Sequence, residues 1–330
     1  MLKVLLITPN FHQTRGNTIT VRRISEGLQS LGIETEIISS TDENLKHRPS
    51  ADIVHGFHAF HFREFMNKHN LHYDKYVVTL TGTDLNQYLY NEDTKMIVLS
   101  TLEKSKAIHV FNEEAKQTLI DNAPTLGEKI YVISQGVEQS TPSTSHFKKD
   151  ENSFLFVLPA GIRKIKNVPS AIHMLKKLRN RYPMVRLWII GPVLEETEGR
   201  KVKQLVNENS DWVEYKGEVP HEEMSEIYIH ADVLLNTSIS EGQSSAILEG
   251  MGHGLPVLVA NNDGNRSIVK HQQTGLVYST ESEFLDYAQQ IMNNNKLRNT
   301  IRQTAKDYIA NHHSHTNEAN MLLKMYRDAL

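Results

Sequence analysis

Apolar segments of strand length recur along the whole chain and are separated by polar or amphipathic segments. They occupy residues 4–7, 34–39, 53–56, 76–80, 107–111 and 130–134 in the first half, and 154–158, 185–191, 212–217, 233–236 and 254–260 in the second. Helical periodicity lies between several of them, for example at 18–31, where Ile24 and Leu28 share one face and Gly32 follows as a stop. Strands that alternate with helices in this way are typical of open, mostly parallel sheets.

A polar segment without periodicity, residues 139–153, predicts a linker between two domains. The length of 330 residues is sufficient for two separate hydrophobic cores. We therefore predict an α/β protein with an N-terminal domain at 1–140, a C-terminal domain at 151–314, and a last helical segment at about 315–330.

Composition excludes several classes of protein. With 36 basic and 39 acidic side chains and a net charge of −3, the chain lacks the basic excess of nucleic-acid-binding proteins. It contains no cysteine, which excludes disulfides and thiolate sites and favours a cytoplasmic enzyme. No apolar run approaches the roughly 20 residues of a membrane span, so we expect a soluble protein, with peripheral membrane contact left open.

The stretch 233–260 carries the strongest candidate site. A buried strand is followed by a turn of small polar residues, a helix that starts near Ser244, and another apolar strand. Backbone N–H groups at such a helix start can hold a diphosphate, while the carboxylates of Glu241 and Glu249 can accept hydrogen bonds from sugar or ribose hydroxyls. This arrangement suits a sugar nucleotide, although composition alone is equally compatible with two surface carboxylates.

The sequence of this stretch resembles a motif of a known family. Glu241, seven intervening residues, Glu249, then Met251, Gly-x-Pro-Val-Leu-Val-Ala and Gly264 are similar to the donor-site signature of retaining glycosyltransferase family 4. That resemblance implies the GT-B fold, in which two Rossmann-like doubly wound domains face an interdomain cleft and the last helix crosses back onto the first domain. It also implies that Glu241 contacts the donor sugar and Glu249 the ribose.

A basic loop opens the second domain. Arg163 and Lys166 follow the strand 154–158, where a guanidinium and an ammonium can clamp a diphosphate or lie solvated on the surface. The loop resembles the family's Gly-Arg…Lys-Gly segment, which implies that both residues hold donor phosphates. The gap between them is shorter than usual, so Lys164 stays an alternative to Lys166. The resemblance also places the nucleobase on the loop of Val219, where it is recognised through backbone groups.

The first domain offers weaker candidates. Gly16, beside Asn17, lies in the loop after the first strand, and the resemblance places this loop near the donor phosphates. The turn 81–84 exposes Asp84, which either orients the acceptor or caps a helix. Many family members carry a histidine at this strand end, where the nearest match in this chain is Thr81. His55, His58 and His61 do not match a zinc pattern, and we expect one or two of them to line the acceptor cleft from a loop.

Two departures from the family pattern lie beside the expected donor sugar. Gly242, Gln243, Ser244 and Ser245 replace the commoner Gly-Phe-Pro-Leu, and Asn265 follows Gly264 where relatives have a second glycine and then a glutamate. Donor choice therefore cannot be copied from better-known members. We still expect the residues 242–245 to contact the donor.

The resemblance implies transfer of a sugar, with retention of configuration, from a nucleoside diphosphate donor to an acceptor hydroxyl, amine or thiol. A UDP-sugar is favoured over a GDP-sugar, and neither a metal nor another cofactor is expected, since no Asp-x-Asp motif is present. The acceptor stays open among a small metabolite, a lipid-linked sugar and a polysaccharide precursor. The alternatives are a GT-B epimerase or hydrolase and a sugar-nucleotide-binding protein without turnover. A Rossmann oxidoreductase is disfavoured because neither domain has the spaced-glycine fingerprint.

Overall fold

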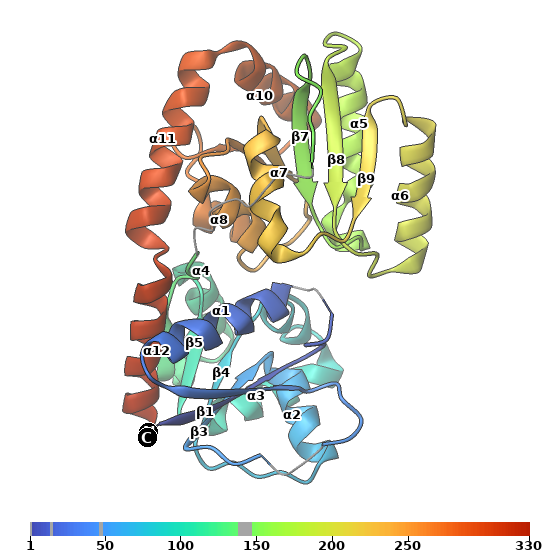
Figure 1. Cartoon of the computed structure of the whole chain (residues 1–330). Helices are drawn as coiled ribbons and strands as arrows, with labels where there is room; N and C mark the ends of the chain where they lie inside the picture. The colour runs from blue at the N-terminus through green and yellow to red at the C-terminus, as the bar shows by residue number, and fades with distance from the viewer. Residues whose placement is uncertain (1, 14–15, 46–48, 138–146) are drawn as a thin grey trace. The chain divides into compact units, whose positions relative to one another are not determined.

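The computed structural model describes residues 2–13, 16–45, 49–137 and 147–330. The chain divides into two compact units (Figure 1). Unit 1 consists of Met1–Gly136 together with His313–Leu330, and unit 2 consists of Val137–His312. Each unit contains a parallel six-stranded sheet, in the orders β2-β1-β3-β4-β5-β6 and β12-β11-β10-β7-β8-β9. The predicted class, two Rossmann-like α/β units, is confirmed.

Both faces of the unit 1 sheet are covered by helices. Along β1, Val4 and Leu6 pack into one core layer and Leu5 and Ile7 into the other, so the apolar run of this strand is buried on both sides. The strands are β1 (Lys3–Thr8), β2 (Glu34–Ser39), β3 (Ile53–Phe57), β4 (Tyr76–Thr79), β5 (Ala107–Val110) and β6 (Ile130–Val132). The first layer includes α1 (Gly16–Ser30) and α12 (His315–Ala329), and the second includes α2 (Ala59–Lys68), α3 (Glu92–Lys104) and α4 (Glu113–Asn122).

The last helix of the chain, α12, is fastened to α1 by a buried ion pair. Arg23 donates to Glu318 through both Nε and Nη2, at 2.8 and 2.9 Å, and the two side chains are 8% and 1% exposed. The ring of His315 lies 2.9 Å from the carbonyl oxygen of Arg23. A Cβ at Gly27 would lie 3.0 Å from Ala319, so the glycine permits close helix packing. The C-terminal segment is thus an integral part of unit 1.

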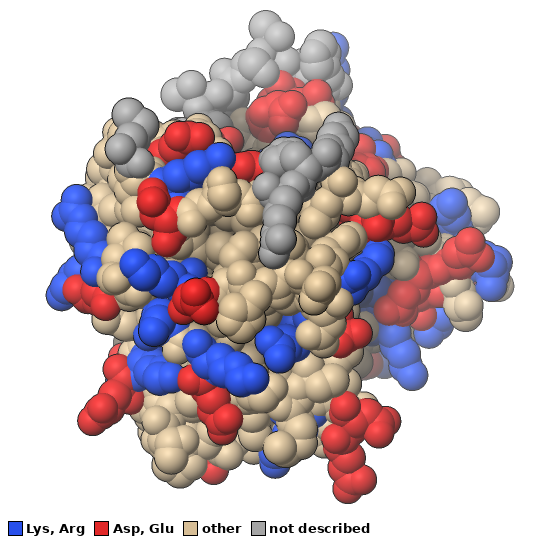
Figure 2. Space-filling view, turned by 90° about the horizontal axis from the view of Figure 1, so that it is seen from below, with Lys and Arg blue, Asp and Glu red and all other residues tan. Residues whose placement is uncertain are grey.

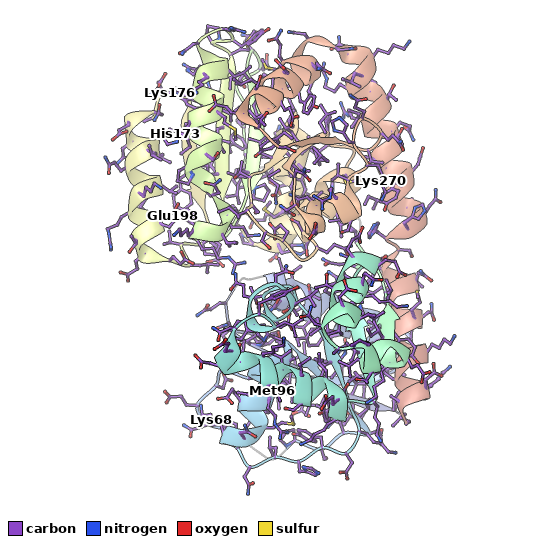
Figure 3. All side chains as sticks on the ribbon, turned by 180° about the vertical axis from the view of Figure 1, so that it is seen from behind. Lys68, Met96, His173, Lys176, Glu198 and Lys270 are labelled. Atoms are coloured by element: carbon purple, nitrogen blue, oxygen red, sulfur yellow. The ribbon has the colours of Figure 1, made fainter. Side chains whose placement is uncertain are left out.

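Unit 2 repeats the layered arrangement. Its strands are β7 (Phe154–Pro159), β8 (Val185–Ile190), β9 (Val213–Gly217), β10 (Val233–Asn236), β11 (Val257–Ala260) and β12 (Leu276–Tyr278). One core layer includes α5 (Val168–Arg179), α6 (Glu196–Glu208) and α10 (Glu281–Asn293), and the other includes α7 (Met224–His230), α8 (Ser245–Gly252) and α9 (Asp263–Ile268). The helix α11 (Asn295–His312) contributes to both layers. His173 and Lys176 lie on the exposed side of α5, opposite its buried face (Figure 3).

The structure adds details that the hydrophobic pattern did not predict. The short elements α9 and β12 were not predicted. Part of the predicted linker, 139–146, lies outside the described residues. The rest packs on unit 2, where Phe147 meets Trp188 with ring centroids 6.2 Å apart and Lys149 forms an ion pair with Asp232.

Candidate functional site

The candidate donor site lies at the carboxyl ends of neighbouring strands of unit 2. Strand β10 pairs with both β7 and β11. The loop after β7 carries Arg163 and Lys166, the loop after β10 carries Glu241, and α9 follows β11. Ligands of open α/β sheets bind at this edge, so the fold brings together groups that are far apart in the sequence.

Glu241 is held on one oxygen only. Its Oε1 accepts hydrogen bonds from Lys166 Nζ at 2.5 Å, Ser238 Oγ at 2.6 Å and Asn236 Nδ2 at 3.1 Å. No described residue donates to Oε2, and the side chain is 9% exposed. Burial alone raises the pKa of Glu241, but the charge and hydrogen bond of Lys166 and the bonds from Ser238 and Asn236 outweigh it and keep the pKa below its usual value. The carboxylate is therefore ionised and fixed, with one oxygen open to a ligand.

Glu249 lies on α8 and is bound on both oxygens. His221 Nε2 lies 2.9 Å from Oε1, and the hydroxyl of Tyr228 donates to Oε2 at 2.9 Å. Tyr228 is buried, while the side chain of His221 is 51% exposed. Val219, two residues before His221, is only 8% exposed and packs into the core. The structure thus joins the loop of Val219 to Glu249 through His221.

Arg163 has an unsatisfied donor. Its Nε is buried and has no hydrogen-bond partner in the described parts of the chain. Lys166 is paired with Glu241, and Lys164, in the same 3-10 turn, is exposed. A buried guanidinium N–H without an acceptor is costly unless a ligand supplies one. Anions are the natural acceptors for such a group.

The small residues of the donor loop lie where the pattern predicted. Gln243 and Ser244 precede α8, and Ser245 is its first residue. Gly264, at the start of α9, touches this loop so closely that a Cβ would lie 2.3 Å from the carbonyl oxygen of Gly242. The loop therefore has a defined support on the α9 side.

The structure corrects the interpretation of Asp84 as an exposed carboxylate. Asp84 is 0% exposed, and its oxygens accept N–H groups of Ala59, Thr81, Gly82 and Leu85 at 2.9–3.2 Å. Burial raises its pKa to about 6, although the four N–H groups favour the ionised form. Asp84 thus stabilises the turn in which it lies, and the turn presents no carboxylate to a ligand.

Gly16 is the first residue of α1 in unit 1 and is exposed. A Cβ at this position would have nothing within 4 Å, so packing gives no reason for a glycine. The preceding residues 14 and 15 lie outside the described parts. The contact of Gly16 with a donor stays a prediction.

The three histidines of the first domain have different surroundings. His55 is buried in β3 and His61 lies in α2, so the prediction of a loop is wrong for these two, whereas His58 lies between the two elements. His58 caps α2 with a backbone φ of 72°, and its Nε2 lies 3.1 Å from Thr83 Oγ1. Backbone strain of this kind concentrates at functional sites. His61 is partly exposed and packs on His58, with the two rings tilted and their centroids 4.3 Å apart.

A buried hydrogen-bond chain involves His55. His109 Nε2 lies 2.9 Å from the carbonyl oxygen of Ile133 and must donate to it, which leaves Nδ1 to accept from Thr79 at 2.8 Å. Thr79 Oγ1 then accepts from His55 Nε2 at 2.6 Å, and the hydroxyl of Tyr326 donates to His55 Nδ1 at 2.7 Å. These roles require neutral rings, which agrees with the burial that lowers the pKa of both histidines, and we assign them a structural role.

Mild acid should destabilise unit 1. Burial lowers the pKa of His109 and His58 to about 4, and burial together with His109 lowers that of His55 well below its usual value of 6.5. Below pH 6.5 the unfolded chain thus binds protons that the folded unit does not, and stability falls as pH decreases, by about 1.4 kcal/mol per pH unit for each fully buried histidine. Asp84 offsets the destabilising effect of one histidine. Its pKa is raised to about 6 in the folded unit, so Asp84 binds a proton on folding at mildly acidic pH.

Hydrogen exchange of the β3–β5 amides at pH 7 and pH 5, corrected for intrinsic rates, measures this loss. The variant His109→Gln keeps a hydrogen-bond donor for the carbonyl oxygen of Ile133 but cannot be protonated. Its loss of stability between pH 7 and pH 5 should therefore be smaller by the contribution of one histidine. Equal protection of the natural protein at both pH values would contradict the prediction.

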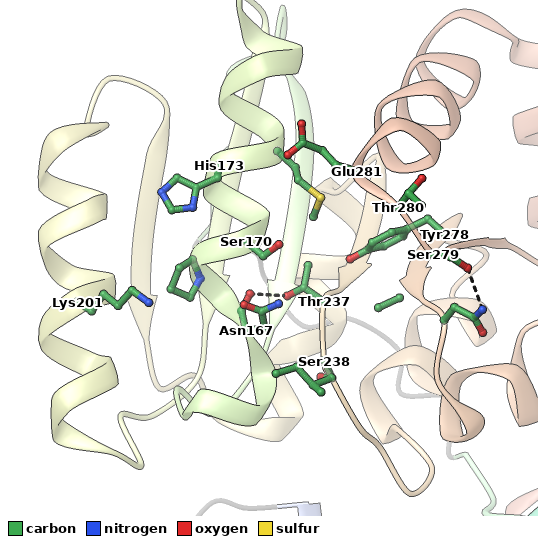
Figure 4. A pocket seen from close by; sticks show the side chains of 15 residues that line it. Asn167, Ser170, His173, Lys201, Thr237, Ser238, Tyr278, Ser279, Thr280 and Glu281 are labelled. Atoms are coloured by element: carbon green, nitrogen blue, oxygen red, sulfur yellow. Dashed lines mark hydrogen bonds between the residues drawn. The ribbon is translucent and has the colours of Figure 1, made fainter.

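A polar groove of about 570 Å³ lies elsewhere on unit 2 (Figure 4). It is lined by residues of α5, the β10 loop and the start of α10, among them Asn167, His173, Ser238 and Glu281. Thr237 Oγ1 bonds the carbonyl oxygen of Asn167 at its base. Ser238, which bonds Glu241, is part of the groove lining, but Arg163, Glu241 and Glu249 are not.

Surface charge and metal ligands add no further site. On the face shown in Figure 2, basic and acidic side chains are interspersed, so no field of a single sign develops there. Within the described ranges, no three His, Asp or Glu side chains come together in a way that could hold a metal ion. None of the helices that the structure describes is long and apolar enough to cross a membrane.

Sequence reasoning missed several residues of the site. Asn236 and Ser238 fix Glu241, and His221 and Tyr228 bond Glu249. Asn236 and Ser238 immediately precede Glu241 at a strand end, which was an available signal. The contacts of Tyr228 depend on tertiary packing and had no local signal.

Comparison with known proteins assigns the family. The model of the family described as "Glycosyl transferases group 1" matches residues 140–308. Glycosyltransferase 1 domain-containing protein 1 of Xenopus tropicalis is 30% identical over 243 residues, which cover 71% of this chain and 70% of that protein. The putative glycosyltransferase YtcC of Bacillus subtilis is 23% identical over 338 residues, covering 89% and 83%.

Solved structures agree in fold. HepE of Anabaena in complex with UDP and glucose has a TM-score of 0.80 at 13% identity, with 99% of this chain and 100% of that chain covered. Sucrose-phosphate synthase of Thermosynechococcus elongatus has a TM-score of 0.80 at 14% identity, covering 99% and 98%. With two Rossmann-like units of the GT-B fold and a family model that covers its second half, this chain belongs to the glycosyl transferases group 1 family.

Proposed function

We propose that the protein is a metal-independent, retaining glycosyltransferase of family 4 that uses a nucleoside diphosphate sugar, with a UDP-sugar favoured. The observation that carries this proposal is a pair of groups in unit 2 that have no hydrogen-bond partner among the described residues. Glu241 Oε2 is open to accept from a sugar hydroxyl, and Arg163 Nε lacks an acceptor that a phosphate would provide. The similarity to HepE, whose structure contains UDP and glucose, supports the same donor class.

The expected chemistry places charge on the departing nucleoside diphosphate. Arg163 and the backbone N–H groups at the start of α8 would stabilise that charge, which is the main electrostatic task in such a transfer. Glu241 would hold the sugar, and Lys166, which now neutralises Glu241, can turn its ammonium toward a phosphate while staying close to the carboxylate. The resemblance to family 4 suggests that the donor phosphate takes the acceptor proton. We assign no acceptor, and we propose His61, beside Tyr88 and Phe60, as a contact for it in unit 1.

Thermal unfolding with UDP, GDP, ADP and their common sugar conjugates, with and without magnesium, tests this function. A ligand that binds only the folded protein raises the melting temperature. We expect a rise with UDP and its conjugates that does not depend on magnesium. Stabilisation and donor breakdown without any acceptor would favour an epimerase or hydrolase, and stabilisation without nucleotide release under any condition would favour a binding protein. No shift with any nucleotide would overturn the proposal.

Glu249→Ala should weaken UDP binding about 10- to 100-fold, because a hydrogen bond to a charged group contributes about 1.5–3 kcal/mol. The effect should be equal for UDP and its sugar conjugates, since the proposed partner of Glu249 is the ribose. Calorimetric titration with UDP measures it. Glu222→Ala, an exposed carboxylate in the turn before α7, is the control and should bind UDP normally. Unchanged affinity in Glu249→Ala would exclude the ribose contact.

A further inference from the structure

The loop that leads into α9 is built against the loop of Glu241. Asn262 caps α9 through Oδ1, which accepts from Asn265 N at 2.9 Å, and its Nδ2 donates to the carbonyl oxygen of Ser238 at 2.9 Å. Gly264 contacts the backbone of Glu241, where a Cβ would lie 2.5 Å from the carbonyl oxygen. The start of α9 and the Glu241 loop therefore cannot move independently.

The amide of Asn265 has only one possible orientation. The residue is 0% exposed, and its side-chain nitrogen donates to Asn236 Oδ1 at 3.1 Å and to the carbonyl oxygen of Ala260 at 2.8 Å. Both partners are acceptors, so the nitrogen must face them. Asn236 Oδ1 also accepts from Ser238 N at 3.0 Å, which leaves Asn236 Nδ2 to face Glu241.

This orientation leaves the other end of the Asn265 amide unsatisfied. Asn265 Oδ1 is buried and has no hydrogen-bond partner in the part of the chain that the structure describes. An unpaired buried carbonyl carries its full desolvation cost, and an apolar side chain of the same size would avoid it. Stability alone therefore does not explain an asparagine at this position.

We propose that Asn265 is a positioning residue for the donor sugar, acting through Asn236 on Glu241. Asn265 fixes the direction of the Asn236 amide, and Asn236 donates to Oε1 of Glu241 and turns Oε2 toward the ligand. The inference rests on the proposed function, in which Glu241 holds the sugar. It assigns a role to Asn265, which follows Gly264 where relatives have a second glycine.

Two substitutions separate positioning from stability. In Asn265→Leu the amide of Asn236 loses the donor that fixes it. In Asn265→Asp the new carboxylate accepts from Asn236 Nδ2, so Asn236 turns its oxygen toward Glu241 and the two oxygens repel each other. Either change should lower turnover of UDP-glucose, measured as UDP release, about tenfold, with UDP affinity unchanged. Asn261→Leu is the control, because Asn261 is exposed in the same loop and bonds Ser279.

The comparison includes Glu241→Gln, and thermal unfolding confirms that each variant folds. If Glu241→Gln and both Asn265 variants lose turnover while their affinity for UDP is unchanged, the inference is supported.

Other outcomes contradict it. If Glu241→Gln loses turnover and the Asn265 variants behave like Asn261→Leu, Asn265 does not position Glu241 and the proposed function stands. Loss of UDP affinity in the Asn265 variants would show a merely structural role. If Glu241→Gln behaves like the natural protein, the proposed role of Glu241 fails, and the inference with it. Should neither Asn265 variant fold, Asn236→Ala gives the same comparison.

Discussion

Arg23→Met should destabilise unit 1 by about 3–5 kcal/mol, because it leaves the carboxylate of Glu318 buried without its partner. Glu318 is 1% exposed, and the guanidinium of Arg23 supplies both of its bonds. The buried carboxylate then has to be hydrated or protonated, and either process favours detachment of α12 from α1. Hydrogen exchange of the α12 amides and urea unfolding measure the loss.

A double variant isolates the pair. Arg23→Met with Glu318→Leu removes both charges and should recover most of the lost stability, since apolar side chains of similar volume often replace a buried ion pair at little cost. Lys177→Met breaks the exposed pair of Lys177 and Glu281, whose side chains are 58% and 47% exposed, and should cost less than about 1 kcal/mol. A double variant as unstable as Arg23→Met would show that packing, not the stranded charge, is responsible.

The strands could be predicted because their signal is local. A run such as that of β1 is apolar at every position, which in a parallel sheet means burial on both faces, and the prediction was right for this strand and the others of both units except β12. The order of the strands is not local. β7 lies between β8 and β10 in the sheet, and only this order brings Lys166 to Glu241, 75 positions later in the chain.

The orientation of side chains in turns was harder to predict, because it depends on backbone angles. The turn 81–84 was expected to expose a carboxylate, but Gly82 adopts a φ of 115° and Asp84 accepts four N–H groups instead. His58 adopts a φ of 72°, so α2 starts directly after β3 and the expected loop is replaced by a helix. Sequence reasoning thus located the edge of the sheet correctly and failed for the orientation of the groups on it.

Arg163→Ala should reduce turnover of the sugar nucleotide about 10²- to 10³-fold and abolish the thermal stabilisation by UDP. The substitution removes a preorganised hydrogen-bond donor that would stabilise the charge developing on the leaving group. The guanidinium should gain more from a phosphate than most surface cations do, since its Nε is already buried and has no acceptor among the described residues. Arg163→Lys should recover little, because an ammonium does not provide the same fork of donors. Steady-state release of UDP and the UDP-dependent melting shift measure both variants.

Two further variants make the result specific. Lys176→Ala changes an exposed cation on α5 and should behave like the natural protein, which controls for a general loss of positive charge (Figure 3). Lys164→Ala tests the exposed lysine of the loop: because Lys166 and not Lys164 is paired with Glu241, Lys164 should contribute much less than Arg163. If Arg163→Ala kept the natural shift with UDP while Lys164→Ala lost it, the phosphates would lie toward the exposed side of the loop, and the site built around Arg163 and Glu241 would have to be abandoned.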